Sequence, residues 1–257
     1  MHITSLQNPR IKSILRLKTN PRHRRATGLF LVEGEYEIGL ALAAGQVPET
    51  LISAPDLASG ALASTEGDRL TVSSAIFAKL SFRENPDGWL AVFRRPASDP
   101  GTLSLSASPL LVVAEAVEKP GNLGAILRTA DAAHADGVIV CDERADIYSP
   151  NVVRASRGAL LAVPVIELSS ADALAYLRAR AIKVVAANPN AGTDLGQADL
   201  GGPVAIAVGT EDAGLSEIWL RNAQVQVRIP MRGKVNSLNV SVAAALLIYE
   251  ALRQRGS

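Results

Sequence analysis

The stretch IPMRGKVNSLNVSVAAALLIYEAL, residues 229–252, joins a polar loop to a nearly continuous apolar segment. Between residues 240 and 249 almost every side chain is apolar, which is unusual for a helix on a protein surface. The loop before this segment carries Asn236, Ser237 and Asn239. Ser237 or Asn236 can cap the helix by accepting hydrogen bonds from its first backbone amides, and Asn239 is then left over. The surplus polar side chain predicts a site at the start of a buried helix.

The composition is that of a folded globular chain. It has 257 residues, of which 48% are hydrophobic and 20% charged, enough for one large domain or two ordinary ones. A single cysteine, Cys141, excludes a disulfide framework and a zinc cluster, and the three histidines have no metal-ligand spacing. The first residues lack the pattern of a signal peptide, and the longest apolar run is too short to span a bilayer. We expect a cytoplasmic protein with no metal site and no membrane contact.

The charge is unevenly distributed along the chain. Seven of the 26 lysines and arginines lie within the first 32 residues, which contain none of the 25 acidic residues. Arg22, Arg24 and Arg25 form the densest part of this basic segment. Such a segment suits an anionic partner such as RNA, and an ordinary solvated basic surface is the simpler alternative.

A break in composition divides the chain. The sequence RRPASDPGTLSLSASP, residues 94–109, is rich in proline and serine and has the character of a linker. We therefore expect a first domain of residues 1–95, a linker of residues 96–108 and a second domain of residues 109–257. The first domain mixes helical and strand-like segments, which indicates a small α/β fold.

The second domain alternates more regularly between strand-like and helical segments. Its apolar, strand-like runs are residues 110–117, 137–142, 161–168, 183–188, 204–209 and 225–230. Apolar strands separated by helices indicate a parallel sheet that is covered on both faces. Ligands of such sheets bind beyond the carboxyl ends of the strands, so the loops after the strands are where a site is expected.

The first of these strand-like runs is followed by the sequence EKPGNLGAILRTADA, residues 118–132, which begins with a loop. Asn122 is a suitable N-cap for the helix that follows. Arg128 lies at the edge of the helix's predicted buried face, near the carboxyl ends of the strands. An arginine in this position suits phosphate binding, and an ordinary surface arginine is the simpler alternative.

The loop GTEDAGLS, residues 209–216, follows the fifth strand-like run. It has two glycines five residues apart but lacks the lysine of a nucleotide-binding P-loop, because Leu215 stands there. The chain also contains neither the G-x-G-x-x-G dinucleotide fingerprint nor the G-x-S-x-G nucleophile elbow of serine hydrolases. Glu211 either contributes to a site or caps the next helix.

Taken together, NLGAILRTADA, GTEDAGLS and IPMRGKVNSLNVSVAAALLIYE resemble the three motifs of the SpoU (TrmH) family of RNA 2′-O-ribose methyltransferases, in the SPOUT superfamily. They occur in the family's order and near its spacing, and the stretch at residues 149–165 also resembles the family. The resemblance implies an α/β fold with a parallel sheet and a C-terminal trefoil knot. It also implies a homodimer formed through the C-terminal domain and a small RNA-binding domain before it.

The resemblance implies a role for individual residues. S-adenosyl-L-methionine would be bound by Gly209, Ile229 and Leu238. The catalytic positions of the family fall on Arg128, Asn122, Glu211, Ser237 and Asn239. Arg128 would either act as the base on the ribose hydroxyl or hold an RNA phosphate and lower the pKa of that hydroxyl; we favour the phosphate, because a guanidinium hardly ever loses its proton. RNA would be bound by Arg154 and by the basic segment with Arg22, Arg24 and Arg25.

The implied function is the transfer of a methyl group to RNA, with ribosomal RNA of the 23S type as the favoured substrate. Aromatic residues are only 4% of the chain, which argues against a base-stacking platform for single strands and favours structured RNA. Two alternatives stay open, a tRNA 2′-O-methyltransferase and an RNA-binding homologue with an inactive site. The sequence names neither the modified nucleotide nor a role in ribosome maturation or antibiotic resistance.

Overall fold

The computed structural model describes residues 2–58, 60, 62 and 67–256, and they form two compact units. Unit 1 contains Met1–Pro96 together with Asp146–Ala162, and unit 2 contains Ala97–Ala145 and Val163–Ser257. Each unit has its own sheet. The first unit therefore includes a piece of chain that the sequence places in the second domain.

Unit 1 is built on a five-stranded mixed sheet with the strand order β1-β4-β3-β5-β2. The pairs β1–β4 and β3–β4 are parallel, and β3–β5 and β2–β5 are antiparallel. The strands are β1 (His2–Ile3), β2 (Leu29–Glu33), β3 (Thr50–Ser53), β4 (Asp68–Val72) and β5 (Trp89–Arg94). The helices are α1 (Pro9–Thr19), α2 (Pro21–Thr27), α3 (Glu35–Ala43), α4 (Ser74–Leu80), α6 (Pro150–Ser156) and α7 (Ala159–Ala162). The small α/β fold expected of the first domain is confirmed.

The helices of the basic segment begin where local sequence dictates. Asn8 caps α1 and Asn20 caps α2, and each is followed by a proline at the first helical position. Helix α1 buries Ile11, Ile14 and Leu17 against the sheet and leaves its charged side chains on the other side.

The segment Asp146–Ala162 packs as an integral part of unit 1. Helix α6 lies against β2, and α7 lies against α3. Asp146 forms an ion pair with Arg24 at 2.7 Å, and both side chains are almost fully buried. The ring of Tyr148 lies 4.8 Å from that of Phe30 between centroids. This chain segment therefore adds both apolar and ionic contacts to the core of unit 1.

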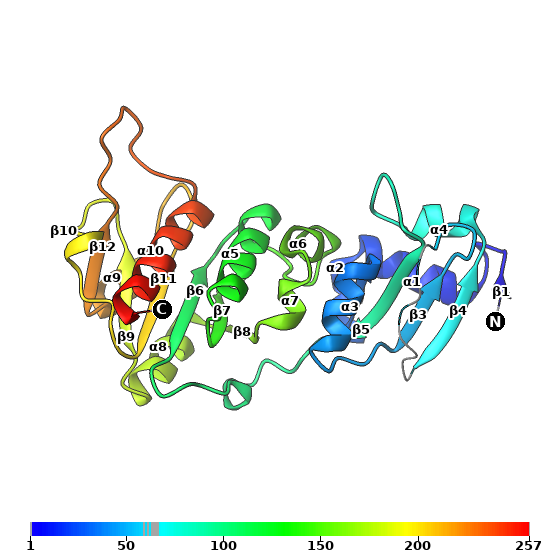
Figure 1. The fold of residues 1–257 in the computed structure, drawn as a ribbon, viewed down its shortest axis with the longest axis horizontal. Helices are drawn as coiled ribbons and strands as arrows, with labels where there is room; N and C mark the ends of the chain where they lie inside the picture. Colours follow the sequence, from blue (N-terminus) through cyan, green and yellow to red (C-terminus); the bar gives the residue numbers. More distant parts are fainter. Residues whose placement is uncertain (1, 59, 61, 63–66, 257) are drawn as a thin grey trace. The chain divides into compact units, whose positions relative to one another are not determined.

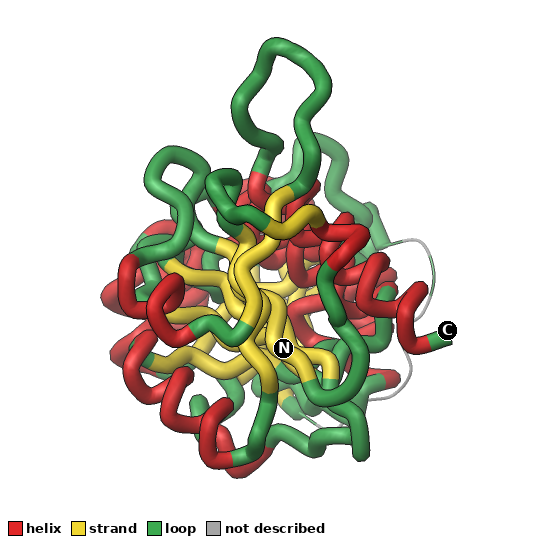
Figure 2. Tube along the Cα trace, turned by 90° about the vertical axis from the view of Figure 1, so that its left-hand side faces the viewer, coloured by secondary structure: helices red, strands yellow, loops and turns green. Residues whose placement is uncertain are grey.

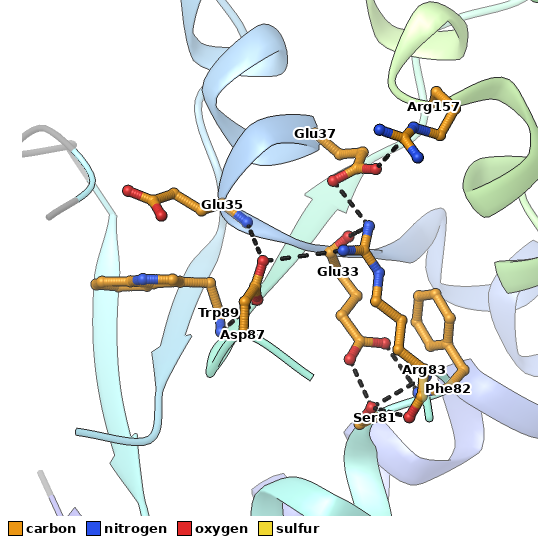
Figure 3. Close-up of polar contacts among 9 residues, drawn as sticks. All are labelled: Glu33, Glu35, Glu37, Ser81, Phe82, Arg83, Asp87, Trp89 and Arg157. Carbon is orange, nitrogen blue, oxygen red and sulfur yellow. Dashed lines mark hydrogen bonds and ion pairs between the residues drawn. The ribbon is translucent and has the colours of Figure 1, made fainter. Parts of the chain in front are cut away.

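A buried polar network closes the turn between β2 and α3 (Figure 3). Arg83 donates to the backbone carbonyl of Glu33 at 2.7 Å and pairs with the buried Glu37 at 2.7 Å. The carboxylate of Glu33 accepts hydrogen bonds from the Ser81 hydroxyl and the Phe82 amide. Gly34 has φ +114°, and a Cβ there would collide with the Arg83 guanidinium. Only glycine fits this turn without moving the network.

Unit 2 contains a seven-stranded parallel sheet with the order β10-β12-β9-β11-β6-β7-β8. The strands are β6 (Leu110–Glu115), β7 (Gly137–Cys141), β8 (Val165–Leu168), β9 (Lys183–Ala187), β10 (Thr193–Asp194), β11 (Val204–Val208) and β12 (Val225–Arg228). The helices are α5 (Pro120–Ala132), α8 (Ser170–Ala179), α9 (Glu217–Asn222) and α10 (Val240–Arg255), with short 3₁₀ turns at Pro100–Thr102 and Leu195–Gln197. The predicted α/β fold with a parallel sheet is confirmed.

Helices cover both faces of this sheet. On one face α8 and α9 contribute Tyr176, Leu177 and Trp219 to a core with the apolar side chains of the strands. On the other face α10 packs beside α5 and against β11 (Figure 1). The central strands are buried on both faces, which is why they consist of nearly uninterrupted apolar residues.

One local prediction for unit 2 was wrong. The run at residues 161–168 is not one strand, because Ala159–Ala162 form helix α7 and only Val165–Leu168 form β8. Pro164 separates the two elements, and proline disfavours helical geometry in the residue before it. In the single chain, helix α10 has an exposed side: Val242, Leu246 and Tyr249 are 47%, 43% and 51% exposed. The absence of a polar face therefore does not mean that the helix is buried all round within one chain.

Candidate active site

The loops that follow β6, β11 and β12 lie at the carboxyl edge of the sheet in unit 2. Parallel strands bring their carboxyl ends to the same edge, so loops that are far apart in the sequence meet there. The loop between β12 and α10 projects away from the elements of its unit (Figures 1 and 2). Residues 232–237 within it are exposed.

One hydrogen-bonded cluster joins the three loops. The Glu211 carboxylate accepts from Asn122 Nδ2 at 2.9 Å and from Asn239 Nδ2 at 2.5 Å. Asn239 Nδ2 also lies 3.0 Å from Asn122 Oδ1, and the Lys119 ammonium forms an ion pair with Glu211. We call Lys119, Asn122, Glu211 and Asn239 the polar cluster. Three of its four members are residues that the sequence analysis selected as catalytic.

The caps of the two helices differ from the prediction. Asn239 itself is the N-cap of α10, and its Oδ1 accepts from the Ser241 amide at 3.0 Å. Neither Ser237 nor Asn236 is the cap, because the helix begins only at Val240. Helix α5 likewise begins at Pro120, so that Asn122 lies inside its first turn and its side chain is directed to Glu211. One side chain, Asn239, therefore caps a helix with its oxygen and binds the cluster with its nitrogen.

The charges of the cluster stabilise each other. The hydrogen bond from Lys119 lowers the pKa of Glu211, with further contributions from Asn122 and Asn239. The same contact raises the pKa of Lys119. Glu211 is therefore ionised at neutral pH and acts only as a hydrogen-bond acceptor, which fits an orienting role rather than that of a general acid.

A cavity of about 990 Å³ opens beside the cluster. Its lining includes Gly209, Glu211, Ile229, Ser237 and Leu238. The volume is at the upper end of the range of small-molecule sites. The three positions assigned to the cofactor thus line one cavity, and they combine backbone groups with apolar side chains that suit an adenine ring and a ribose.

Gly209 allows the close turn at the wall of this cavity. A Cβ at Gly209 would lie 2.1 Å from the carbonyl oxygen of Gly214. The backbones of Thr210 and Gly214 bond to each other in both directions, at 3.0 and 3.1 Å. Any side chain at Gly209 would push this loop open. The loop therefore requires glycine at this position for steric reasons, and the same residue also lines the cavity.

A second, smaller cavity of about 150 Å³ shares the loop at residues 209–213 with the first. Its lining also includes Lys119, Asn122 and Arg144. Glu211 lines both cavities. The polar cluster therefore lies between the two cavities, where a molecule bound in the large cavity would be next to a molecule bound in the small one.

Arg128 lies apart from these cavities in the single chain. It is an exposed residue of α5, six residues after Asn122, and it lines neither cavity. At ~1.5 Å of helix rise per residue, its Cα lies roughly 9 Å further along the helix axis than that of Asn122. No hydrogen bond or ion pair links its side chain to another described residue. In the single chain, Arg128 is therefore not placed to act on a molecule bound in either cavity.

The sequence analysis did not select Lys119. It precedes Pro120 and is the N-cap residue of α5, although its side chain makes no capping bond. Its contact with Glu211 spans 92 residues of sequence, so no local pattern indicates it. The only available signal was a lysine three residues before the first motif.

The residues predicted to bind RNA all belong to unit 1. Arg22 and Arg25 of α2 and Arg154 of α6 are exposed, and both helices pack against β2. Arg24 is different, because only 3% of it is exposed and its guanidinium binds Asp146 and the Leu17 carbonyl. The expectation that Arg24 contacts RNA is therefore corrected: its spacing along α2 turns it into the core, where it pairs with a carboxylate.

Two kinds of feature are absent from the part of the chain that the structure describes. Its helices are all too short or too polar to cross a membrane. It also contains no group of three or more His, Cys, Asp or Glu side chains placed to hold a metal ion.

Comparisons with known proteins agree with the fold and the three motifs. Residues 109–249 match the SpoU rRNA methylase family, and residues 8–91 match the MRM3-like substrate binding domain. A 23S rRNA (uridine(2479)-2′-O)-methyltransferase from Streptomyces viridochromogenes is 32% identical, over 98% of this chain and 92% of its own length.

Solved structures extend the similarity to three dimensions. An RNA 2′-O ribose methyltransferase is 44% identical and has a TM-score of 0.84, with 100% of both chains covered. The SpoU methyltransferase AviRb from Streptomyces viridochromogenes, in complex with the cofactor AdoMet, is 31% identical with a TM-score of 0.91; the match covers 98% of this chain and 99% of that one.

The fold, the loops at the carboxyl edge and these relatives define an RNA ribose 2′-O-methyltransferase that uses S-adenosylmethionine. The chain belongs to the SpoU rRNA methylase family. The resemblance stated from the sequence is thereby confirmed, as are the enzyme class and the cofactor. The trefoil knot stays a prediction.

Proposed function

We propose that this enzyme methylates the ribose 2′-hydroxyl of a nucleotide in ribosomal RNA of the 23S type, in the cytoplasm. The observation that carries the proposal is the polar cluster, which joins all three family motifs beside a cavity large enough for S-adenosylmethionine. The relative from Streptomyces viridochromogenes, named for 23S rRNA, matches nearly the whole chain, including the N-terminal part.

The reaction itself demands little of the protein beyond orientation. When bound, S-adenosylmethionine supplies a methyl group that is activated by the positive charge on sulfur. The protein must hold the acceptor hydroxyl in line with this methyl and accommodate the proton that the hydroxyl loses. We propose that Gly209, Ile229 and Leu238 hold the cofactor, while Asn122, Glu211 and Asn239 keep the loops in register. Ser237, exposed at the cavity, then contacts the bound reactants.

We propose that Arg128 binds a phosphate of the RNA and lowers the pKa of the 2′-hydroxyl. A guanidinium has five donors and no acceptor, so it stabilises a developing alkoxide but does not remove the proton itself, which passes to solvent water. Because Arg128 lines neither cavity of its own chain, we propose that it serves the cavity of a second copy in a homodimer.

We propose that this homodimer forms through α10. Val242, Leu246 and Tyr249 recur at helical spacing and leave an apolar stripe exposed. Large apolar side chains that line up on one helix face mark an interaction site rather than a random surface. Helix α10 packs beside α5, which carries Arg128, so a partner on this stripe docks next to the arginine.

Mixing two impaired variants tests the shared site. Arg128→Ala and Asn239→Asp chains are each expected to have at most about a tenth of the wild-type activity alone. In a mixed dimer, one of the two sites combines an intact cluster with an intact Arg128. Random mixing of equal amounts therefore restores about a quarter of the wild-type activity if sites form between chains. No restoration in verified mixed dimers would place Arg128 and the cluster in the same chain.

We propose that Arg22, Arg25 and Arg154 bind RNA through its phosphates. All three side chains belong to exposed residues on helices that pack against β2. Phosphate contacts of this kind weaken as salt increases.

The target is tested by mapping 2′-O-methyl groups in rRNA and tRNA from cells with and without the protein. We expect one 23S-type ribose to lose its methyl group when the protein is absent. A methyl group lost from tRNA instead would contradict the ribosomal assignment. In vitro, calorimetry with S-adenosylmethionine separates an active enzyme from an inactive RNA-binding homologue, which would not bind the cofactor.

A further inference from the structure

We infer that Glu115 is a positioning residue that holds the loop at residues 209–216 in the shape needed for methyl transfer. Glu115 is the last residue of β6 and only 5% of it is exposed. It belongs neither to the polar cluster nor to the lining of the two cavities. The inference rests on the proposed function, because the loop that it anchors carries Gly209 and Glu211.

The Glu115 carboxylate is bound at both oxygens by a single residue of this loop. Its Oε2 accepts from the Ser216 amide at 2.8 Å, and its Oε1 accepts from the Ser216 hydroxyl. These two residues are 101 positions apart in the sequence. A two-point contact of this kind fixes both the position and the orientation of the Ser216 backbone.

A third neighbour does not compete for this carboxylate. The Ser170 hydroxyl lies 3.4 Å from Glu115 Oε1 but only 2.5 Å from Asp142 Oδ2. A hydroxyl has one proton, so Ser170 donates to Asp142 and accepts from Trp219 Nε1 at 2.8 Å. Ser216 is therefore the residue that satisfies Glu115.

The burial of Glu115 makes the contact a strong constraint. A buried carboxylate without donors is costly by several kcal/mol, so any shift of Ser216 away from Glu115 is opposed. Ser216 is the N-cap residue of α9, yet its side chain makes no capping hydrogen bond. Its hydroxyl serves the carboxylate instead of the helix, which is the less usual use of a serine at this position.

The constraint reaches the site through a short, closed loop. Gly209 continues directly from β11, and the mutual bonds of Thr210 and Gly214 close the loop on itself. Ser216 is two residues after Gly214 and five after Glu211. Glu115 thus fixes the far end of a loop whose near end is fixed by the sheet, and Glu211 lies between the two fixed points.

The test compares Glu115→Gln and Ser216→Ala with the control Ser170→Ala in the full-length enzyme. Glu115→Gln keeps the shape but loses the charge and one acceptor for the two Ser216 donors. Ser216→Ala removes one donor at an exposed residue, so it does not threaten the core. The control removes a buried hydroxyl from the same neighbourhood without touching the loop.

For both loop variants we expect the Kd of S-adenosylmethionine, measured by calorimetry without RNA, to rise about tenfold or more, as for a lost hydrogen bond to a charged group. We expect kcat to fall and the KM for RNA to stay within about twofold. The double variant should be no worse than the more severe single variant, because both changes break one interaction.

Three outcomes would overturn the inference: unchanged cofactor binding and kcat in both variants, additive effects in the double variant, or an equal loss in Ser170→Ala. If Glu115→Gln fails to fold, Ser216→Ala alone decides the matter. Wild-type protein that does not bind S-adenosylmethionine would contradict the proposed function instead, so the two failures are distinguishable.

Discussion

The Nδ2 atom of Asn239 lies 2.5 Å from Oε1 of Glu211, while Oδ1 of the same asparagine caps helix α10. The last helix of the chain and the loop after β11 therefore depend on one side chain. The nitrogen of this amide binds Glu211 and the oxygen caps the helix, so a substitution can remove one of these interactions and keep the other.

Asn239→Asp keeps the capping oxygen but replaces the Nδ2 donor by a carboxylate oxygen, which places a second negative charge beside Glu211. Asp and Asn are equally good N-caps, so we expect little change in the melting temperature. Like charges in contact oppose each other, and we expect kcat to fall about tenfold or more because a hydrogen bond to a charged group is lost. Asn239→Ala should also lose about 1 kcal/mol of stability with the cap. Normal turnover by Asn239→Asp would contradict the role of the cluster.

Arg128→Ala is expected to lower methyl transfer by about 100-fold or more while leaving the Kd of S-adenosylmethionine unchanged. The reason is that Arg128 lines neither cavity of its own chain and, in our proposal, contacts only the RNA. The matched control is Arg178→Ala, an exposed arginine of α8 that bonds to Asn222. Equal loss in both variants would show a non-specific charge effect.

Leu246→Glu places a charge in the middle of the exposed stripe of α10. If this stripe is the dimer interface, the sedimentation coefficient should change from that of a dimer to that of a monomer at micromolar concentration. Ile218→Glu serves as the control, because Ile218 is 39% exposed on α9, away from the stripe. A Leu246→Glu variant that remains dimeric places the interface elsewhere.

Arg24 and Arg22 are two residues apart but should respond oppositely to substitution. Arg24→Ala leaves the carboxylate of Asp146 buried without its partner, and we expect a loss of about 3–5 kcal/mol in the free energy of unfolding. Arg22→Ala should leave stability unchanged, weaken RNA binding and reduce the salt dependence of the affinity by about one charge. Urea denaturation and RNA titrations at several salt concentrations measure both effects. Comparable stability losses would refute the assignment.

Burial raises the pKa of Glu33 above its ordinary value of 4.5, although the Ser81 and Phe82 hydrogen bonds oppose this shift. Between that value and the raised pKa, the folded protein binds more protons than the unfolded chain. The contribution of Glu33 to the free energy of unfolding therefore falls as the pH increases through this window. The difference in unfolding free energy between wild type and Glu33→Gln should change in this direction. A difference independent of pH would contradict the shift.

In the first domain, local sequence determines where some elements begin, and contacts in the folded unit stabilise others. Asn8 and Asn20, each followed by proline, set the starts of α1 and α2, and such signals can be read from a few consecutive residues. A cap signal marks where a helix can begin, but the short, mostly polar sequences of strand β4 and helix α2 have no clear apolar period that would predict the elements themselves. Their conformation is stabilised by neighbours in the folded unit rather than by local preference.

The sequence by itself determined the parallel sheet of unit 2, the three loops at its carboxyl edge and the family to which they belong. Apolar runs, glycine turns and helix-starting residues act over short distances along the chain, so their pattern is visible without coordinates. Only the tertiary structure decided that Asn239 is both cap and cluster residue, that Arg24 is buried against Asp146, and that Glu115 holds Ser216. The contacts of Asn239 with Glu211, of Arg24 with Asp146 and of Glu115 with Ser216 each join residues more than 25 positions apart, and Asn122 and Asn239 are 117 apart. Their free energy comes from burial and geometry that exist only after the chain has folded.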